Sequence, residues 1–141
     1  MDSRPIFLVE DNPDDEKLTL RAFAKRKIAN PVIVAHDGQE ALDYLLDPAN
    51  GLPAIILLDL KLPKIGGLEL LKRVRADART KRVPVVILTT SKEDTDLATA
   101  YKFGCNSYIL KPIDFDQFVD TLGQLGLYWL VLNEPPPAGN S

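Results

Sequence analysis

The sequence predicts an α/β fold in which a doubly wound parallel sheet is covered by helices on both faces. Short runs rich in Val, Ile and Leu alternate five times with amphipathic, helix-like segments, and most of these runs are apolar at consecutive positions. Continuous apolar runs are typical of strands that are buried on both faces. Five strand–helix units in series therefore favour a parallel sheet with helical crossovers.

The predicted elements follow one another in a single domain, residues 1–133, without an internal repeat. Strands are expected at Pro5–Glu10, Pro31–Ala35, Ala54–Leu60, Pro84–Thr89 and Ser107–Leu110. Helices are expected at Asp14–Lys27, Gln39–Leu46, Leu68–Arg75, Asp94–Phe103 and from Phe115 to about Leu132. Residues 134–141 contain three consecutive prolines and are expected to form a disordered tail.

Local signals support these boundaries. Asp14 and Asp15 stand at the start of the first helix, where carboxylates complement the helix dipole. The pair Asp37-Gly38 predicts a turn after the second strand, and Asp114 is placed to cap the last helix. We therefore interpret Asp14 and Asp15 as helix-start acids and not as metal ligands.

The composition argues against several classes of function. The net charge is −3, and no block of five or six basic residues suggests a nucleic-acid surface. With one cysteine, Cys105, and one histidine, His36, the chain cannot form an internal disulfide and is poorly suited to zinc chemistry. It has no cleavable signal and no apolar segment of about 18 residues, so a cytoplasmic protein without a membrane span is expected.

Acidic and polar residues stand at the predicted carboxyl ends of the strands, where open α/β sheets bind their ligands. The first strand ends in Glu10 and Asp11, the third in Asp59, the fourth in Thr89 and the fifth in Lys111. Three close carboxylates repel one another, so a hard divalent cation such as Mg²⁺ and the lysine ammonium would offset their charge. The set is suited to phosphoryl transfer, in which a carboxylate can be the nucleophile.

The segments VEDNPDD, LLDLKLPKIGGLELL, PVVILTTS and SYILKP resemble the response-regulator receiver domains of two-component signalling. The resemblance spans about Ile6 to Leu132. Asp59 precedes Thr89 by 30 residues and Lys111 by 52, and both spacings match the family pattern. The resemblance implies a flavodoxin-like doubly wound sheet of five parallel strands in the order 2-1-3-4-5, with five helices.

This resemblance also implies roles for the acidic residues. Asp59 would accept a phosphoryl group from a histidine kinase. Asp11 and Asp59 would bind Mg²⁺ together with the backbone carbonyl of Lys61, while Glu10 would act through a water molecule. The protein would then be a phosphoacceptor that assists its own magnesium-dependent phosphorylation and dephosphorylation, and not an enzyme with a separate substrate.

The remaining strand-end residues would carry the switch in such a receiver. Lys111 would pair with the acceptor carboxylate and later with a phosphate oxygen, and Lys111–Pro112 resembles the family's cis peptide bond. Thr89 would turn its hydroxyl towards the phosphoryl group. Tyr108 would then swing into the space behind Thr89 and alter the face formed by the fourth helix, fifth strand and fifth helix.

The opening VEDNPDD…LTLRAF and the ending GLYWLVLNEPPP resemble the stand-alone regulators that accompany bacterial phytochromes. The implied partner is a phytochrome-type histidine kinase, and the implied assembly is a dimer through the face just described. Because only about nine residues follow the last helix, output is expected through protein contacts and not through a fused DNA-binding domain.

The last predicted helix suggests a homodimer on different grounds. One apolar stripe faces the core, and beyond Gly126 further apolar residues fall on the far side of the helix. A single domain can bury one such face but not both. We therefore predict a homodimer contact at Leu127, Tyr128, Leu130 and Val131. The alternative is that the end of the helix folds under the tail.

Three other classes of protein compete with the receiver interpretation. A haloacid-dehalogenase-like phosphatase needs a second aspartate two residues after its nucleophile, where this chain has Lys61. A flavodoxin-like cofactor binder would need glycines in the first loop, which reads EDNPDD. A receiver-like interaction module that is never phosphorylated stays as the alternative, although the full set of strand-end residues argues against it.

Overall fold

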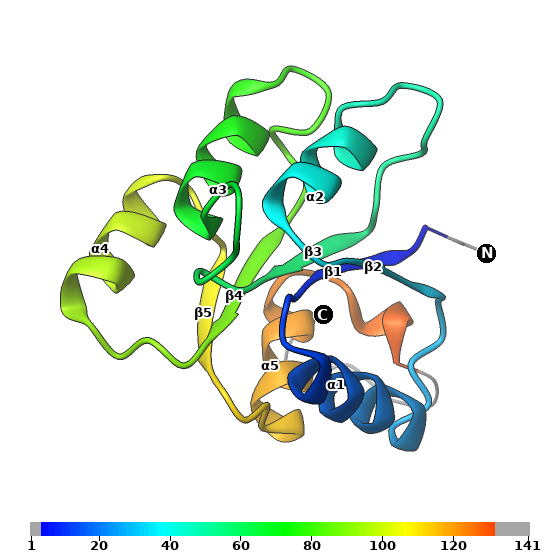
Figure 1. The fold of residues 1–141 in the computed structure, drawn as a ribbon. Helices are drawn as coiled ribbons and strands as arrows, with labels where there is room; N and C mark the ends of the chain where they lie inside the picture. Colours follow the sequence, from blue (N-terminus) through cyan, green and yellow to red (C-terminus); the bar gives the residue numbers. More distant parts are fainter. Residues whose placement is uncertain (1–3, 132–141) are drawn as a thin grey trace.

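The computed structural model describes residues 4–131, which form a five-stranded parallel sheet with helices on both faces (Figure 1). The strands, in the spatial order β2-β1-β3-β4-β5, are β1 (Ile6–Val9), β2 (Val32–Ala35), β3 (Ile55–Leu58), β4 (Val85–Thr89) and β5 (Ser107–Leu110). The helices are α1 (Pro13–Lys25), α2 (Gly38–Leu45), α3 (Gly67–Ala76), α4 (Asp94–Lys102), α5 (Phe115–Gln124) and the 3-10 helix η1 (Tyr128–Leu130). The predicted α/β class and strand order are confirmed.

Two hydrophobic cores lie on opposite faces of this sheet. Helices α2, α3 and α4 cover one face, and α1 and α5 cover the other (Figure 1). The central strands β1, β3 and β4 are buried along their whole length, whereas the edge strands β2 and β5 are only partly buried. This double coverage explains the continuous apolar runs of the central strands.

The parallel register brings the strand ends to one edge of the sheet. Val9, the last residue of β1, pairs with Ala35 on one side and Leu58 on the other. Thr89 at the end of β4 pairs with Leu110 at the end of β5. The residues that follow these positions therefore emerge side by side.

Helix α5 is shorter than predicted. It ends at Gln124 instead of continuing to about Leu132, because Gly126 adopts a φ of +73° that an L side chain rarely tolerates. The amide of Gly126 donates to the carbonyl of Gly123 at 3.0 Å, and the amide of Leu127 donates to the carbonyl of Leu122 at 2.7 Å. These two bonds form a Schellman motif, which terminates a helix.

The chain after α5 turns back onto its own core, which corrects the predicted dimer surface. Leu127, Leu130 and Val131 are buried in the core beside α1 and α5, so they are not an exposed patch for a second copy. Val131 forms an antiparallel bridge with Ile28, and the amide of Ala29 donates to the carbonyl of Leu130 at 2.6 Å. The prediction fails because the apolar periodicity continues past Gly126, although the helix ends before it.

Two predictions at the C-terminus fall on parts that the structure does not describe. The fourth residue of the predicted dimer contact, Tyr128, begins η1, but its side chain lies outside the described part. The predicted disordered tail, residues 134–141, also lies outside residues 4–131. Within the described residues, none of the helices combines the length and apolar character that a bilayer span requires.

Candidate functional site

Asp59 follows β3 and is held by donors on both carboxylate oxygens. Its Oδ1 accepts hydrogen bonds from the Thr89 hydroxyl at 3.0 Å and from the Lys61 amide at 3.1 Å. Its Oδ2 accepts from the Lys111 ammonium at 2.8 Å. The side chain is only 9% exposed. The carboxylate is therefore fixed in orientation at the carboxyl edge of the sheet.

Two further acids lie beside Asp59. Glu10, Asp11 and Asp59 each offer a carboxylate oxygen, and these oxygens lie within 4.8 Å of one another. Glu10 is buried and Asp11 is exposed, so the cluster opens to solvent on the Asp11 side. A set of carboxylate oxygens at this spacing fits a hard divalent cation. The sequence-predicted acids are thus brought together.

The ammonium of Lys111 lies between three carboxylates. Its Nζ is 2.5 Å from Oε1 of Glu10, 2.8 Å from Oδ2 of Asp15 and 2.8 Å from Oδ2 of Asp59. Burial opposes the charge of the ammonium, but the hydrogen bonds to the three carboxylates outweigh it and raise the pKa of Lys111. Lys111 is therefore a permanent cation in this site.

Glu10 is the most buried of the acids. Burial raises the pKa of Glu10 to about 7, although the hydrogen bond and charge of Lys111 act in the opposite direction. Its Oε1 lies next to Lys111, and its Oε2 accepts a hydrogen bond of 3.3 Å from the Asn12 amide. Protein groups therefore contact both oxygens of this carboxylate.

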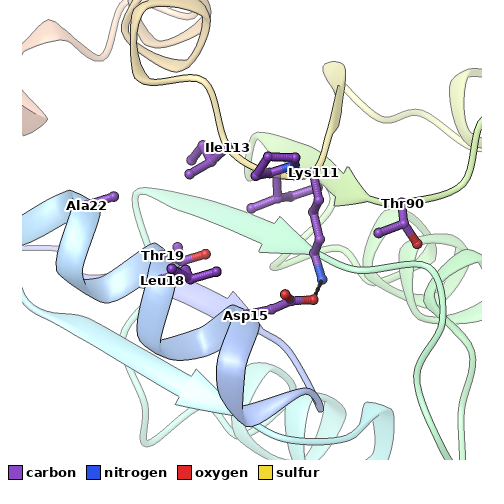
Figure 2. A pocket seen from close by; sticks show the side chains of 9 residues that line it. Asp15, Leu18, Thr19, Ala22, Thr90, Lys111 and Ile113 are labelled. Atoms are coloured by element: carbon purple, nitrogen blue, oxygen red, sulfur yellow. Dashed lines mark hydrogen bonds and ion pairs between the residues drawn. The ribbon is translucent and has the colours of Figure 1, made fainter.

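Asp15 also belongs to the site, although the sequence predicts only a helix-start acid at this position. Helix α1 begins directly after the acid pair, and its cap Asn12 accepts hydrogen bonds from the amides of Asp14 and Asp15. Figure 2 shows the Asp15 carboxylate pointing at the Lys111 ammonium. In the sequence, Asp14 and Asp15 are equivalent helix-start acids. Only the packing of α1 against the β5–α5 connection distinguishes them.

A pocket of about 360 Å³ lies between α1 and the start of the β5–α5 connection (Figure 2). Its walls are mainly apolar, and the Asp15–Lys111 ion pair borders it (Figure 2). The lining residues are Asp15, Leu18, Thr19, Ala22, Leu88, Thr90, Lys111, Pro112 and Ile113. The Lys111–Pro112 peptide bond in this wall is cis.

A chain of contacts links the acceptor to Tyr108 on the edge strand β5. The Thr89 hydroxyl donates to Asp59 and accepts a hydrogen bond of 3.4 Å from the Ser91 amide. The carbonyl of Ser91 accepts a hydrogen bond of 3.0 Å from the hydroxyl of Tyr108. Tyr108 and Ser91 also line a second pocket, of about 370 Å³, between α4, β5 and α5. Tyr108 is thus connected to Asp59 through the β4–α4 loop.

Glycine at position 67 allows the close approach of α3 to the acceptor. The amide of Gly67 donates to the carbonyl of Leu60 at 3.0 Å. A Cβ at this position would meet the carbonyl oxygen of Asp59 and would lie 2.6 Å from Cα of Leu60. A side chain at residue 67 would therefore push directly on the backbone that carries Asp59.

The chain belongs to the response regulator receiver domain family, which it matches over residues 6–123. The probable methanogenesis regulatory protein FilR2 of Methanothrix harundinacea is 42% identical over 134 residues, which cover 93% of this chain and 86% of FilR2. Response regulator Rcp1 of Synechocystis is 32% identical over 129 residues, which cover 89% of this chain and 88% of Rcp1. The receiver prediction is confirmed.

Solved structures agree with this assignment. The bacteriophytochrome response regulator AtBRR is 48% identical with a TM-score of 0.83, and the match covers 95% of this chain and all of that one. The phosphorylated cyanobacterial phytochrome response regulator RcpA is 36% identical with a TM-score of 0.76, at 97% and 100% coverage. The Mn²⁺-bound form of Rcp1 is 31% identical with a TM-score of 0.75, at 96% and 99% coverage. This chain is therefore similar to phytochrome-associated response regulators.

Proposed function

We propose that this response regulator accepts a phosphoryl group on Asp59 from a histidine kinase. The observation that carries the proposal is the fixed, nearly buried carboxylate of Asp59 between the Lys111 ammonium, the Thr89 hydroxyl and two further acids. Its nucleophilic oxygen attacks the phosphorus of a phosphohistidine, the P–N bond breaks, and an acyl phosphate forms. Positioning and charge neutralisation carry most of such a transfer.

The acid cluster is the proposed metal site, and Mg²⁺ is the proposed metal. Asp11 and Asp59 would hold it with the backbone carbonyl of Lys61, and Glu10 would act through water because Lys111 and the Asn12 amide already contact its oxygens. The donor set of hard oxygens fits Mg²⁺, and the Mn²⁺-bound form of Rcp1 supports a divalent ion. The metal would supply positive charge to the oxygens of the transferring phosphoryl group.

Thr89 and Tyr108 are the proposed switch. The new phosphoryl group adds roughly −1.5 to −2 charges and three acceptor oxygens, which would draw the Thr89 hydroxyl away from Asp59. Ser91 would follow because its amide donates to Thr89, and its carbonyl holds the Tyr108 hydroxyl. Tyr108 would then change its position and with it the face formed by α4, β5 and α5.

The proposed partner is a phytochrome-type histidine kinase in the cytoplasm. The support is the similarity to AtBRR and RcpA, both of which are phytochrome response regulators. The proposed assembly is a homodimer that forms through the α4–β5–α5 face. This face carries exposed apolar side chains on α4 and β5, which are Leu97, Tyr101 and Leu110. Light scattering of Leu97→Asp and Tyr101→Asp should then report a monomer.

Phosphorylation itself is tested by mass spectrometry after incubation with acetyl phosphate and Mg²⁺. The wild type should gain the mass of one phosphoryl group, and Asp59→Asn should gain none. A third sample with EDTA should stay unlabelled if the metal is required. Equal labelling of wild type and Asp59→Asn would contradict the assignment, and an unlabelled wild type would favour the non-phosphorylated interaction module.

A further inference from the structure

Among the residues that the structure describes, the ammonium of Lys111 is surrounded by carboxylates. An ammonium carries three N–H groups. Three carboxylates from three different elements contact Nζ: Glu10 after β1, Asp15 in α1 and Asp59 after β3. If Lys111 is to contact an oxygen of a phosphoryl group on Asp59, one of these three interactions has to be released.

The three carboxylates differ in how readily they can be released. The side chain of Glu10 is 1% exposed and that of Asp59 is 9% exposed, so each would lose its cation where water cannot replace it. The side chain of Asp15 is 32% exposed. Water can hydrate the released Asp15 carboxylate, and an ion pair with a solvent-accessible partner contributes little to stability.

The position of Asp15 allows it to hold the Lys111 ammonium in the unphosphorylated protein. The ion pair joins the first turn of α1 to the end of β5 and borders the pocket between them (Figure 2). Asp15 lies outside the group of three acids whose oxygens cluster for a cation, so its carboxylate contacts the lysine and not the candidate metal site. Its negative charge thus competes directly with a phosphoryl group for Lys111.

We propose that Asp15 is a positioning residue that holds the Lys111 ammonium in the unphosphorylated protein and releases it to the phosphoryl group. The inference rests on the proposed function of Asp59. In this arrangement Asp15 opposes phosphorylation, because both its negative charge and its ion pair with Lys111 favour the unphosphorylated protein. Removing the Asp15 charge should therefore stabilise the phosphorylated state and not weaken it.

The test compares Asp15→Asn with Asp14→Asn, which removes the same charge from the same helix turn without touching Lys111. The probe is beryllium fluoride with Mg²⁺, a mimic of a phosphoryl group on a carboxylate, and its affinity is measured by calorimetry. Asp15→Asn should bind it about fivefold more tightly than the wild type, the size expected for one partly exposed ion pair. Asp14→Asn should change affinity by less than about twofold, and Asp15→Glu, which keeps the charge, should stay near the wild type.

A second readout follows Lys111 without any phosphoryl mimic. Hydrogen exchange of the Lys111 ammonium, observed by nitrogen-15 NMR, should be faster in Asp15→Asn than in the wild type and unchanged in Asp14→Asn. A structural role of Asp15 elsewhere in α1 would lower stability without this specific change.

Two results would overturn the inference while leaving the proposed function intact. One is equal or weaker binding of beryllium fluoride by Asp15→Asn relative to Asp14→Asn, and the other is unchanged exchange at Lys111. A wild type that binds no beryllium fluoride would instead refute the proposed function. The exchange measurement would still decide whether Asp15 anchors the lysine.

Discussion

The hydroxyl of Thr89 donates a hydrogen bond of 3.0 Å to Oδ1 of Asp59, and Thr89 is completely buried. The two residues stand at the ends of neighbouring strands, β4 and β3. The threonine is thus already bound to the proposed acceptor before any phosphoryl group arrives. Phosphorylation would exchange the partner of an existing hydrogen bond instead of creating a new one.

Replacing Thr89 by valine should separate stability from switching. Thr89→Val keeps the shape but loses a hydrogen bond to a charged acceptor, so the free energy of unfolding should fall by about 1–3 kcal/mol. The link to Ser91 and Tyr108 should also be lost. Urea unfolding measures the loss of stability. The link to Tyr108 is measured by fluorine NMR of fluorotyrosine-labelled protein after addition of beryllium fluoride. The Tyr108 signal is assigned through Tyr108→Phe. Thr89→Ser keeps the hydroxyl and should retain the Tyr108 shift; a shift in Thr89→Val would contradict the proposed linkage.

Removing the central cation should make the protein depend on magnesium. In Lys111→Met the buried carboxylates of Glu10 and Asp59 lose their cation, which should cost about 3–5 kcal/mol of stability in EDTA. Magnesium should then raise the melting temperature of Lys111→Met more than that of the wild type, because the ion no longer competes with an ammonium. Thermal unfolding with and without Mg²⁺ measures this difference. Lys92→Met, which removes an exposed lysine, is the control and should behave as the wild type; a smaller magnesium effect in Lys111→Met would count against the cluster as a metal site.

The contact of α3 with the acceptor strand predicts different effects at two adjacent glycines. Gly67→Ala would place a Cβ against the backbone of Asp59 and Leu60, and the resulting shift should cost about 1–3 kcal/mol and slow labelling by acetyl phosphate. At Gly66 a Cβ meets nothing within 4 Å, and its φ of −66° suits any residue. Gly66→Ala should therefore cost only about 0.5 kcal/mol, the loss of a favoured residue at the N-cap of α3. Similar losses in both variants, measured by urea unfolding, would argue against the close approach.

The buried thiol predicts a loss of stability at high pH. Burial raises the pKa of Cys105 to about 11 from an ordinary value of 9.0, against the opposing charge of Arg75. The neutral thiol is therefore favoured in the folded protein, and its contribution is complete below pH 9 and is lost as the pH rises towards 11. Urea unfolding between pH 8 and 11 should show a steeper decline for the wild type than for Cys105→Ala. Parallel curves would show that the thiol does not titrate differently on unfolding.

Much of the site could be predicted because each strand ends in a chemically distinct residue. Continuous apolar runs located the strands, and parallel register then required Asp11, Asp59 and Thr89 to share one edge. No pattern over the sequence distinguishes Asp15 from Asp14, since both fit the start of a helix. Their difference arises when α1 packs beside the end of β5, which is a tertiary contact between residues 96 positions apart.

The C-terminal part was harder to predict for a different physical reason. Helical periodicity continues past Gly126, so the apolar residues beyond it seemed to belong to a second helix face. A glycine near the end of a helix is a known stop signal. The continuous periodicity nevertheless favours one long helix, and that interpretation predicts a dimer contact at Leu127, Leu130 and Val131. These side chains instead complete the core of their own chain.

The Schellman turn after α5 has a practical consequence for the limits of the folding unit. The match to the family's receiver domain ends at residue 123, yet the chain beyond it supplies buried side chains and a bridge to the segment before β2. A fragment cut at residue 123 would leave Phe118 and Leu122 without part of their cover. Tags and fusion partners for this receiver should accordingly leave residues 124–131 in place and be attached after them.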